Sequence, residues 1–293
     1  MKLFIHERDD VSYIALEGRL DANGVAEMEQ PFADAIIGRG LPTVVDISGI
    51  SFMSSLGIGM LFDTTKKLKK SGRKLVLLNP QGMVETVLKT SKMDRLMPLA
   101  YDLDEAVRLV GGAPTIGASA TTRGETAAGP VSAAKRSGTP DVLKLTIKND
   151  ISELAGLYAR ANELLVRHGV PYRSGYAINL AIEELVVNVI RYAYLDDDEH
   201  AIDIGLGVID EQIILEIRDS GRPFDPRQAP PHDPDAEDLE AGGLGLILVL
   251  DLVDSLSYRR DNDKNNVRVG VRIHAEEGEL WNAPAKEAST TSQ

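Results

Sequence analysis

The chain has 293 residues and a formal net charge of −13, which is long enough for two domains of ordinary size. It has no cysteine, and its five histidines lack the spacing of metal ligands, which excludes disulfides, thiol catalysis and a histidine–cysteine metal site. No apolar run approaches the ~18 residues of a membrane span, the charged N-terminal segment is unlike a signal peptide, and no basic patch indicates nucleic acid, so we expect a cytoplasmic protein with protein partners.

Residues 1–110 alternate β-rich segments with amphipathic ones, which predicts an α/β domain. Asp9 and Asp10 separate the first two strands and predict a hairpin. Because strands and helices then alternate, we expect a central sheet with helices on one face. The expected strands are 2–7, 11–17, 42–47 and 74–78, and the expected helices are 22–37, 54–70, 80–89 and 103–110.

Residues 111–140 interrupt this pattern, because they are mostly Gly, Ala, Ser, Thr and Pro and include no aromatic residue. This composition predicts a flexible linker with a root-mean-square reach of about 30 Å. Residues 141–274 then show helices followed mainly by antiparallel strands, which predicts a second domain, an α+β sandwich. We expect the polar residues 275–293 to form a disordered tail. The second domain's expected strands are 142–148, 201–208, 212–218, 258–260 and 267–273, and its outer helices are 151–167 and 246–256.

The segment 181–194 predicts a helix that is apolar on nearly every side and is therefore buried. It carries Glu184, Asn188 and Arg191 at i, i+4 and i+7, so the three side chains share one face. A carboxylate, an amide oxygen and a cation in a row suit a hydrated metal ion and a phosphate. A core helix with one satisfied polar edge is an equally good interpretation of this segment alone. Glu183 lies about 140° from Asn188 around the helix, so Glu184 is the expected partner.

Two further motifs follow along the chain. Asp219 ends a predicted strand close to Gly221, and a carboxylate there can accept a hydrogen bond from an exocyclic amine such as that of adenine. Gly243 and Gly245 precede a predicted helix, whose unpaired N–H groups suit a phosphate. Taken singly, these motifs are equally a common turn and a loop hinge, and the glycines match neither a dinucleotide fingerprint nor a P-loop. Their order after Glu184, with an acidic Pro-rich insert between them, makes the combination specific.

With these residues in view, the second domain resembles the GHKL ATPase fold and, within it, the serine-kinase anti-sigma factors of bacterial partner-switching systems. The likeness covers about residues 141–274. It departs at Arg191-Tyr192, where the family often has a His or Lys beside a small residue. Arg191 keeps the charge and stays a candidate contact for the nucleotide. Histidine-kinase relatives carry a phosphoacceptor histidine on a dimerising helix, which we do not expect here. The segments that carry the likeness are 184–194, 219–226, 242–246 and 258–266.

The resemblance implies catalytic and nucleotide-binding roles. Glu184 would be the general base that takes the proton of a substrate serine, and Asn188 would hold Mg²⁺ beside the triphosphate. Asp219, with Gly221 beside it, would bind the adenine amine of ATP. Gly243 and Gly245 would contact the phosphates, and residues 226–241 would form the ATP lid.

In the first domain, Ser54 and Ser55 follow a predicted strand and open a predicted helix. A serine at a helix start is most often a cap, and position alone favours that interpretation. A helix N-terminus also stabilises a phosphate, so an exposed serine there is chemically suited to carry one.

Residues 1–110 resemble the STAS domain of anti-sigma-factor antagonists. The segments 18–21 and 52–57 carry the likeness, and by this alignment Ser55 is the phosphoacceptor. Ser54 stands where the best-known members have Asp, and Leu56 stands where they have Ser or Thr. These substitutions leave the phosphoacceptor in place.

We therefore expect an ATP- and Mg²⁺-dependent serine protein kinase fused to its usual type of substrate. The resemblance implies that an unphosphorylated STAS domain, its own or a separate one, binds the kinase, and that phosphorylation frees the kinase for a sigma factor or similar regulator. It also implies a possible homodimer through the kinase domain. Fusion raises the effective concentration to about millimolar, which favours self-engagement at Ser55. The alternative is a non-catalytic ATP-binding adaptor whose STAS domain recruits a third protein, but the presence of both Glu184 and Asn188 favours an enzyme.

Overall fold

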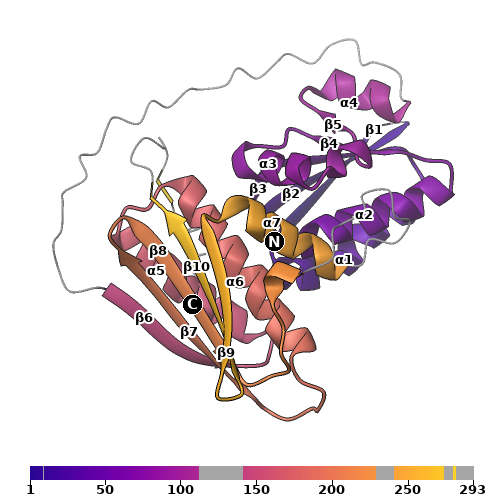
Figure 1. Cartoon of the computed structure of the whole chain (residues 1–293). Coiled ribbons are helices and arrows are strands. Elements are labelled where there is room, and N and C mark those ends of the chain that lie inside the picture. The colour runs from indigo at the N-terminus through magenta and orange to yellow at the C-terminus, as the bar shows by residue number, and fades with distance from the viewer. Residues whose placement is uncertain (9, 112–140, 229–240, 274–279, 282–293) are drawn as a thin grey trace, which may run out of the picture.

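The computed structural model of the chain describes residues 1–8, 10–111, 141–228, 241–273 and 280–281. Most of the predicted linker, ATP lid and tail lies outside these residues. The described part of the chain contains two five-stranded sheets, each with helices packed on it (Figure 1). No helix in these ranges is long and apolar enough to cross a membrane.

The first sheet begins with the predicted hairpin and has the strand order β1-β2-β3-β4-β5. β1 and β2 are antiparallel, whereas each later pair is parallel. β3 extends past its predicted end and leads almost directly into the next helix. β5 has only two residues, too few for a sequence pattern. The strands are β1 (Lys2–Arg8), β2 (Val11–Leu20), β3 (Thr43–Met53), β4 (Leu75–Leu78) and β5 (Leu99–Ala100), with a short 3₁₀ helix η1 (Met93–Arg95) before β5.

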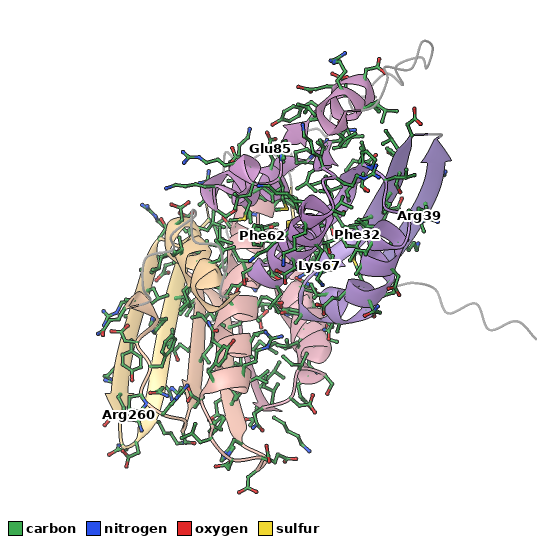
Figure 2. The ribbon with its side chains drawn as sticks, turned by 90° about the vertical axis from the view of Figure 1, so that its right-hand side faces the viewer. Phe32, Arg39, Phe62, Lys67, Glu85 and Arg260 are labelled. Atoms are coloured by element: carbon green, nitrogen blue, oxygen red, sulfur yellow. The ribbon has the colours of Figure 1, made fainter. Side chains whose placement is uncertain are left out.

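Helices cover both faces of this sheet, so the prediction that they share one face is wrong. Val45 and Leu77 pack in one apolar layer, whereas Val44 and Val76 pack with a single helix on the opposite face. Strands that are buried on both sides are apolar at successive positions, so their pattern does not reveal which face each helix covers. Phe62, labelled in Figure 2, lies in the first layer. That layer contains α1 (Ala22–Ile37), α2 (Ser55–Lys70) and α3 (Gly82–Thr90), and α4 (Leu103–Val110) covers the other face.

The second sheet is antiparallel throughout and has the order β6-β7-β8-β10-β9. Two helices, α5 and α6, pack on it, and α7 packs beside α6. This arrangement confirms the predicted α+β sandwich. The strands are β6 (Asp141–Lys148), β7 (Ala201–Ile209), β8 (Gln212–Asp219), β9 (Ser255–Asp261) and β10 (Lys264–Arg272), and the helices are α5 (Glu153–Arg167), α6 (Tyr172–Tyr192), η2 (Pro226–Gln228) and α7 (Ala241–Leu252).

The two domains contact each other through their helices. α7 of the second domain packs on α2 and α3 of the first, and buried apolar side chains of both domains form one continuous cluster. Figure 1 shows α7 where the two domains meet, beside the helices of the first. As a result, the start of α2 lies against the middle of α6, where sequence analysis places the candidate base.

Trp281 lies in the predicted disordered tail, but its side chain is buried, so the prediction is wrong at this position. Trp281 is 3% exposed, and its Nε1 donates a hydrogen bond to Asn162 Oδ1 at 2.9 Å. Its backbone N–H donates to the Val170 carbonyl oxygen at 2.7 Å. The indole packs on Gly175, where an added Cβ would lie 2.6 Å from the ring. One aromatic residue in a polar stretch creates no periodic pattern, so sequence periodicity does not detect it.

Replacing Trp281 with alanine is expected to destabilise the second domain by about 3–5 kcal/mol, because a large buried aromatic side chain is lost. Chemical denaturation followed by circular dichroism measures the free energy of unfolding. Trp281→Phe is the matched control and should lose clearly less, since it keeps most of the packing. An alanine variant as stable as the native chain would contradict the buried position.

Candidate active site

Ser54 and Ser55 have different environments, although they are neighbours at the start of α2. Ser54 is the N-cap: its Oγ accepts a hydrogen bond from the Gly57 N–H at 3.5 Å and donates one to the Leu20 carbonyl oxygen at 3.1 Å. Ser55 is the first residue of the helix. The capping role that position favours therefore belongs to Ser54, and the hydroxyl of Ser55 is left for a partner outside the first domain.

The partner of Ser55 is Glu184 of α6. Ser55 Oγ donates to Glu184 Oε2 at 2.6 Å, and the Ser55 N–H donates to Glu184 Oε1 at 2.8 Å. The two residues are 3% and 6% exposed, respectively. A hydroxyl at this distance from a carboxylate is within reach of direct proton transfer. The structure thus brings together the predicted phosphoacceptor and the predicted general base, which lie 129 positions apart in the chain.

The surroundings of Glu184 favour a stronger base. Burial raises the pKa of its carboxyl, while the hydrogen bonds from Ser55 and the positive charge of Arg191 act in the opposite direction. Gly245 of α7 lies against this pair: a Cβ there would lie 1.8 Å from Glu184 Oε2 and 2.9 Å from Ser55 Oγ. The contact between the two domains therefore requires glycine at position 245. The phosphate contact of Gly245 stays a prediction.

A pocket lies between α6, β8, β10 and η2 and encloses about 220 Å³. Asn188 and Asp219, the predicted magnesium and adenine residues, both line it. Most other side chains around it are apolar, including Leu185, Ile217 and Phe224. A largely apolar pocket with a few polar groups suits a flat heterocycle that must be oriented.

Asp219 is buried, and its Oδ1 accepts hydrogen bonds from the Gly221 N–H and from Asn265 Nδ2, each at 2.8 Å. Within the described residues Oδ2 has no such bond, so it can accept one from a ligand amine. A Cβ on Gly221 would lie 2.5 Å from the Ala193 Cβ, so only glycine fits there. Arg260, labelled in Figure 2, donates to Asn265 Oδ1 at 2.8 Å and orients this amide. Sequence analysis does not single out Asn265, because this residue lies in the polar segment between two predicted strands, where one asparagine carries no specific signal.

Asn188 lies one helical turn beyond Glu184 and is partly exposed. Its amide has no hydrogen-bond partner among the described residues, and no group of three His, Cys, Asp or Glu side chains in those ranges could hold a metal without help. An amide oxygen combined with phosphate oxygens and water is a ligand set that Mg²⁺ accepts, so these residues fit an ion held jointly with a nucleotide. Arg191 is exposed at the end of α6, and Gly243 has open space around it at the start of α7. Their nucleotide contacts stay predictions.

Two tyrosines of α6 bind the backbone of β3, and sequence analysis identifies neither. Tyr176 Oη donates to the Met53 carbonyl oxygen at 2.9 Å and accepts from the Met53 N–H at 3.1 Å. Tyr172 Oη donates to the Ser51 carbonyl oxygen at 2.8 Å. Tyr176 is fully buried against Phe52, with ring centroids 4.9 Å apart, and burial raises the pKa of its phenol. A spacing of four on an apolar helix is typical of core residues, so the pattern alone gives no sign of an interdomain contact.

Glu183, the neighbour of the candidate base, contacts the first domain separately. The N–H of Ala22, the first residue of α1, donates to Glu183 Oε1 at 2.6 Å, and the carboxyl is fully buried. Nearby, Arg19 forms an ion pair with Asp21 at 2.8 Å, and its guanidinium lies 5.4 Å from the ring centroid of Tyr158 on α5. The helical wheel correctly separates Glu183 from Asn188, but it cannot show that a second domain covers that side of α6.

Docking of the two domains is expected to weaken as pH rises. Burial raises the pKa of Glu183 to about 8, the charges of Glu184 and Asp21 act in the same direction, and Arg19 opposes them. The docked form therefore holds a proton that the separated domains release, because an exposed carboxyl has a pKa near 4.5. This contribution to docking is complete below that value and is lost as pH rises through about 8.

Small-angle X-ray scattering of the Ser55→Ala chain, which lacks the phosphoacceptor, tests this dependence. The radius of gyration should increase between about pH 6 and pH 9 as docking weakens. Glu183→Gln should remove most of the change, because glutamine does not titrate. If the radius of the Ser55→Ala chain stays constant over this range, the proton is not linked to docking.

Two family models match the chain. Residues 147–271 match the histidine kinase-like ATPase domain, and residues 3–106 match the STAS domain. The first range contains Glu184, Asn188 and Asp219, and the second contains Ser55. The predicted pairing of a GHKL-type domain with a STAS domain is confirmed by these matches.

Curated relatives are similar to about a third of the chain. A serine-protein kinase RsbW of Oceanobacillus iheyensis is 32% identical over 36% of this chain and 67% of that protein. A serine/threonine-protein kinase BtrW of Bordetella bronchiseptica is 30% identical over 32% of this chain and 68% of that protein. Among solved structures, an anti-sigma factor antagonist from Mycobacterium paratuberculosis is 24% identical, with a TM-score of 0.34, over 37% of this chain and 92% of that one.

Proposed function

The chain belongs to the RsbW-type serine-protein kinases, with a histidine kinase-like ATPase domain preceded here by a STAS domain, and from this we propose that it transfers the terminal phosphate of ATP to Ser55 of its own STAS domain. The proposal includes dependence on Mg²⁺. Its main support is the 2.6 Å hydrogen bond from Ser55 Oγ to Glu184 Oε2. A hydroxyl that donates to a buried carboxylate at this distance supports general-base catalysis, with Ser55 as the nucleophile and Glu184 as the base.

In the proposed reaction, the proton of the Ser55 hydroxyl passes to Glu184. Ser55 Oγ forms a bond to the terminal phosphorus, and the bond between that phosphorus and the bridging oxygen of ADP breaks. The Ser55 N–H, which donates to Glu184 Oε1 at 2.8 Å, keeps the carboxylate aligned with the hydroxyl. Asp219 would accept a hydrogen bond from the adenine amine, and Asn188 would hold Mg²⁺, which neutralises phosphate charge when bound.

We further propose a partner-switching role for this reaction. The docked STAS domain covers Glu184, so the kinase domain cannot present this surface to another protein while the two are together. Phosphorylation of Ser55 would separate the domains and free that surface for a sigma factor or a similar regulator. The presence of a serine-kinase domain and a STAS domain in one chain supports this assignment.

Intact-mass spectrometry of the full chain after incubation with Mg-ATP tests the proposal. We expect one added phosphate, mapped to Ser55 and absent from Ser55→Ala. Ser54→Ala is the matched control, because it removes the neighbouring hydroxyl and leaves the acceptor. A chain that binds ATP but gains no phosphate would favour the ATP-binding adaptor instead, and a phosphate elsewhere would contradict the choice of acceptor.

Asp219→Asn is expected to weaken ATP binding by about tenfold or more, because a hydrogen bond to a charged group contributes about 1.5–3 kcal/mol. The preference for ATP over GTP should fall as well, since Asp219 would bind the amine that only adenine carries at that position. Calorimetric titration with both nucleotides measures the two effects. Asp203→Asn, on an exposed position of β7, is the matched control. Native ATP affinity in Asp219→Asn would remove Asp219 from the nucleotide site.

A further inference from the structure

We propose that Glu183 is a specificity-determining residue, which selects the acceptor domain by binding the backbone N–H at the start of α1. This inference rests on the proposed function, because it concerns how the kinase domain recognises the domain that carries its phosphoacceptor. Glu183 touches none of the reacting atoms, so its role is recognition and not proton transfer.

The carboxyl groups of two adjacent residues of α6 bind the starts of two different helices. Glu184 Oε1 accepts the Ser55 N–H of α2 at 2.8 Å, and Glu183 Oε1 accepts the Ala22 N–H of α1 at 2.6 Å. The first N–H groups of a helix have no partner within the helix and carry partial positive charge, so the acceptor oxygen of a carboxyl group complements them. One contact holds the reacting hydroxyl, and the other fixes the orientation of the domain that carries it.

The start of α1 is prepared for this contact. Asp21 is the N-cap, and its Oδ1 accepts the Gly24 N–H at 3.0 Å, which leaves the Ala22 N–H for Glu183. Arg19 pairs with Asp21 at 2.8 Å, and its positive charge offsets the negative charge of Asp21 beside the buried Glu183. The N–H is thus held in place by the first domain itself before the domains meet.

Burial makes the contact selective. Glu183 is fully buried and Ala22 is 4% exposed. Glu183 Oε2 is also buried and has no hydrogen-bond partner among the described residues. The bond from the Ala22 N–H to Oε1 therefore provides most of the free energy that offsets the cost of burying this side chain. An acceptor without an N–H at that point would leave the whole carboxyl buried and unpaired, which penalises the wrong partner.

The test compares acceptors in trans. The donor is the full chain with Ser55→Ala. The acceptors are full chains with Glu183→Ala and Glu184→Ala, either native at position 22 or carrying Ala22→Pro, so that an acceptor's own kinase domain does not bind the N–H under test. Proline removes this one N–H and is favoured at the first position of a helix, and the preceding Asp21 has the extended backbone that proline requires (φ −92°, ψ −175°). Leu103→Pro is the matched control. It also puts proline at the first position of a helix after an extended N-cap, but this helix, α4, lies on the opposite face of the sheet.

We expect kcat/KM of the donor to be at least about tenfold higher for the native acceptor than for Ala22→Pro. The change should lie in KM, which rises for Ala22→Pro, while kcat stays the same. The Leu103→Pro acceptor should behave as native. A donor that also carries Glu183→Ala should lose the discrimination, whereas Glu183→Gln, which keeps an acceptor oxygen, should retain most of it. The donor's own STAS domain competes equally with every acceptor, so the ratio is unaffected by it.

An unchanged ratio in the Glu183→Ala donor would overturn the inference. Calorimetric binding of the same acceptors to the same donors gives a second ratio that needs no phosphate transfer. If binding discriminates but no phosphate is transferred, the proposed function fails and the recognition by Glu183 stands. If phosphate is transferred and neither ratio depends on Glu183, the kinase assignment stands and this inference fails.

Discussion

Replacing Glu184 with glutamine is expected to slow phosphate transfer to Ser55 by about 10²–10⁴-fold, which is the usual contribution of a general base. Glutamine has nearly the same size and keeps an oxygen that can accept the Ser55 N–H, so the domains should stay docked while the proton acceptor is lost. Timed intact-mass measurements at saturating Mg-ATP give the rate constant for the native chain and the variant.

The adjacent carboxylate supplies the control for this experiment. Glu183→Gln removes a buried acid from the same helix, but in the single chain it should slow transfer far less, because the linked domains remain at about millimolar effective concentration. ATP affinity should be native in both variants, since neither residue lines the pocket proposed for the nucleotide. A Glu184→Gln chain that transfers phosphate at the native rate would rule out Glu184 as the base.

Much of the fold is predictable because it follows local patterns. α1 and α4 have the predicted bounds, since each begins after an aspartate cap and carries a clear apolar stripe. The features that were missed depend on tertiary contacts. The position of α4 on the second face of the sheet and the burial of Trp281 arise from packing between segments that are distant in sequence.

The candidate site divides in the same way. Glu184, Asn188 and Asp219 stand out in the sequence because polar groups in an apolar helix or at a strand end need an explanation. Tyr176 and Glu183 do not stand out, because one resembles a core aromatic residue and the other points away from the predicted metal residue. Their partners lie in the other domain, and sequence spacing contains no information on how two linked domains meet.

A phosphate on Ser55 is expected to weaken docking of the two domains by at least about 100-fold, which corresponds to about 2.7 kcal/mol. Phosphoserine carries about −1.5 to −2 charges, and the Ser55 oxygen lies 2.6 Å from Glu184 Oε2. Two unit charges 4 Å apart repel each other by about 4 kcal/mol at an effective dielectric constant of 20. Glu184 cannot move away from the phosphate towards α7, because its carboxyl group already occupies the space where a Cβ of residue 245 would lie.

Small-angle scattering and hydrogen exchange of the chain phosphorylated at Ser55 measure this separation. The radius of gyration should rise, and the backbone N–H of Met53, which Tyr176 accepts at 3.1 Å in the docked form, should exchange faster. Ser55→Ala incubated with the same Mg-ATP is the control, since it binds nucleotide without gaining charge. If a chain with its phosphate mapped to Ser55 keeps the unphosphorylated radius and exchange rates, repulsion at Glu184 does not separate the domains. Partner switching would then require a different trigger, because Glu184 would stay covered after the reaction.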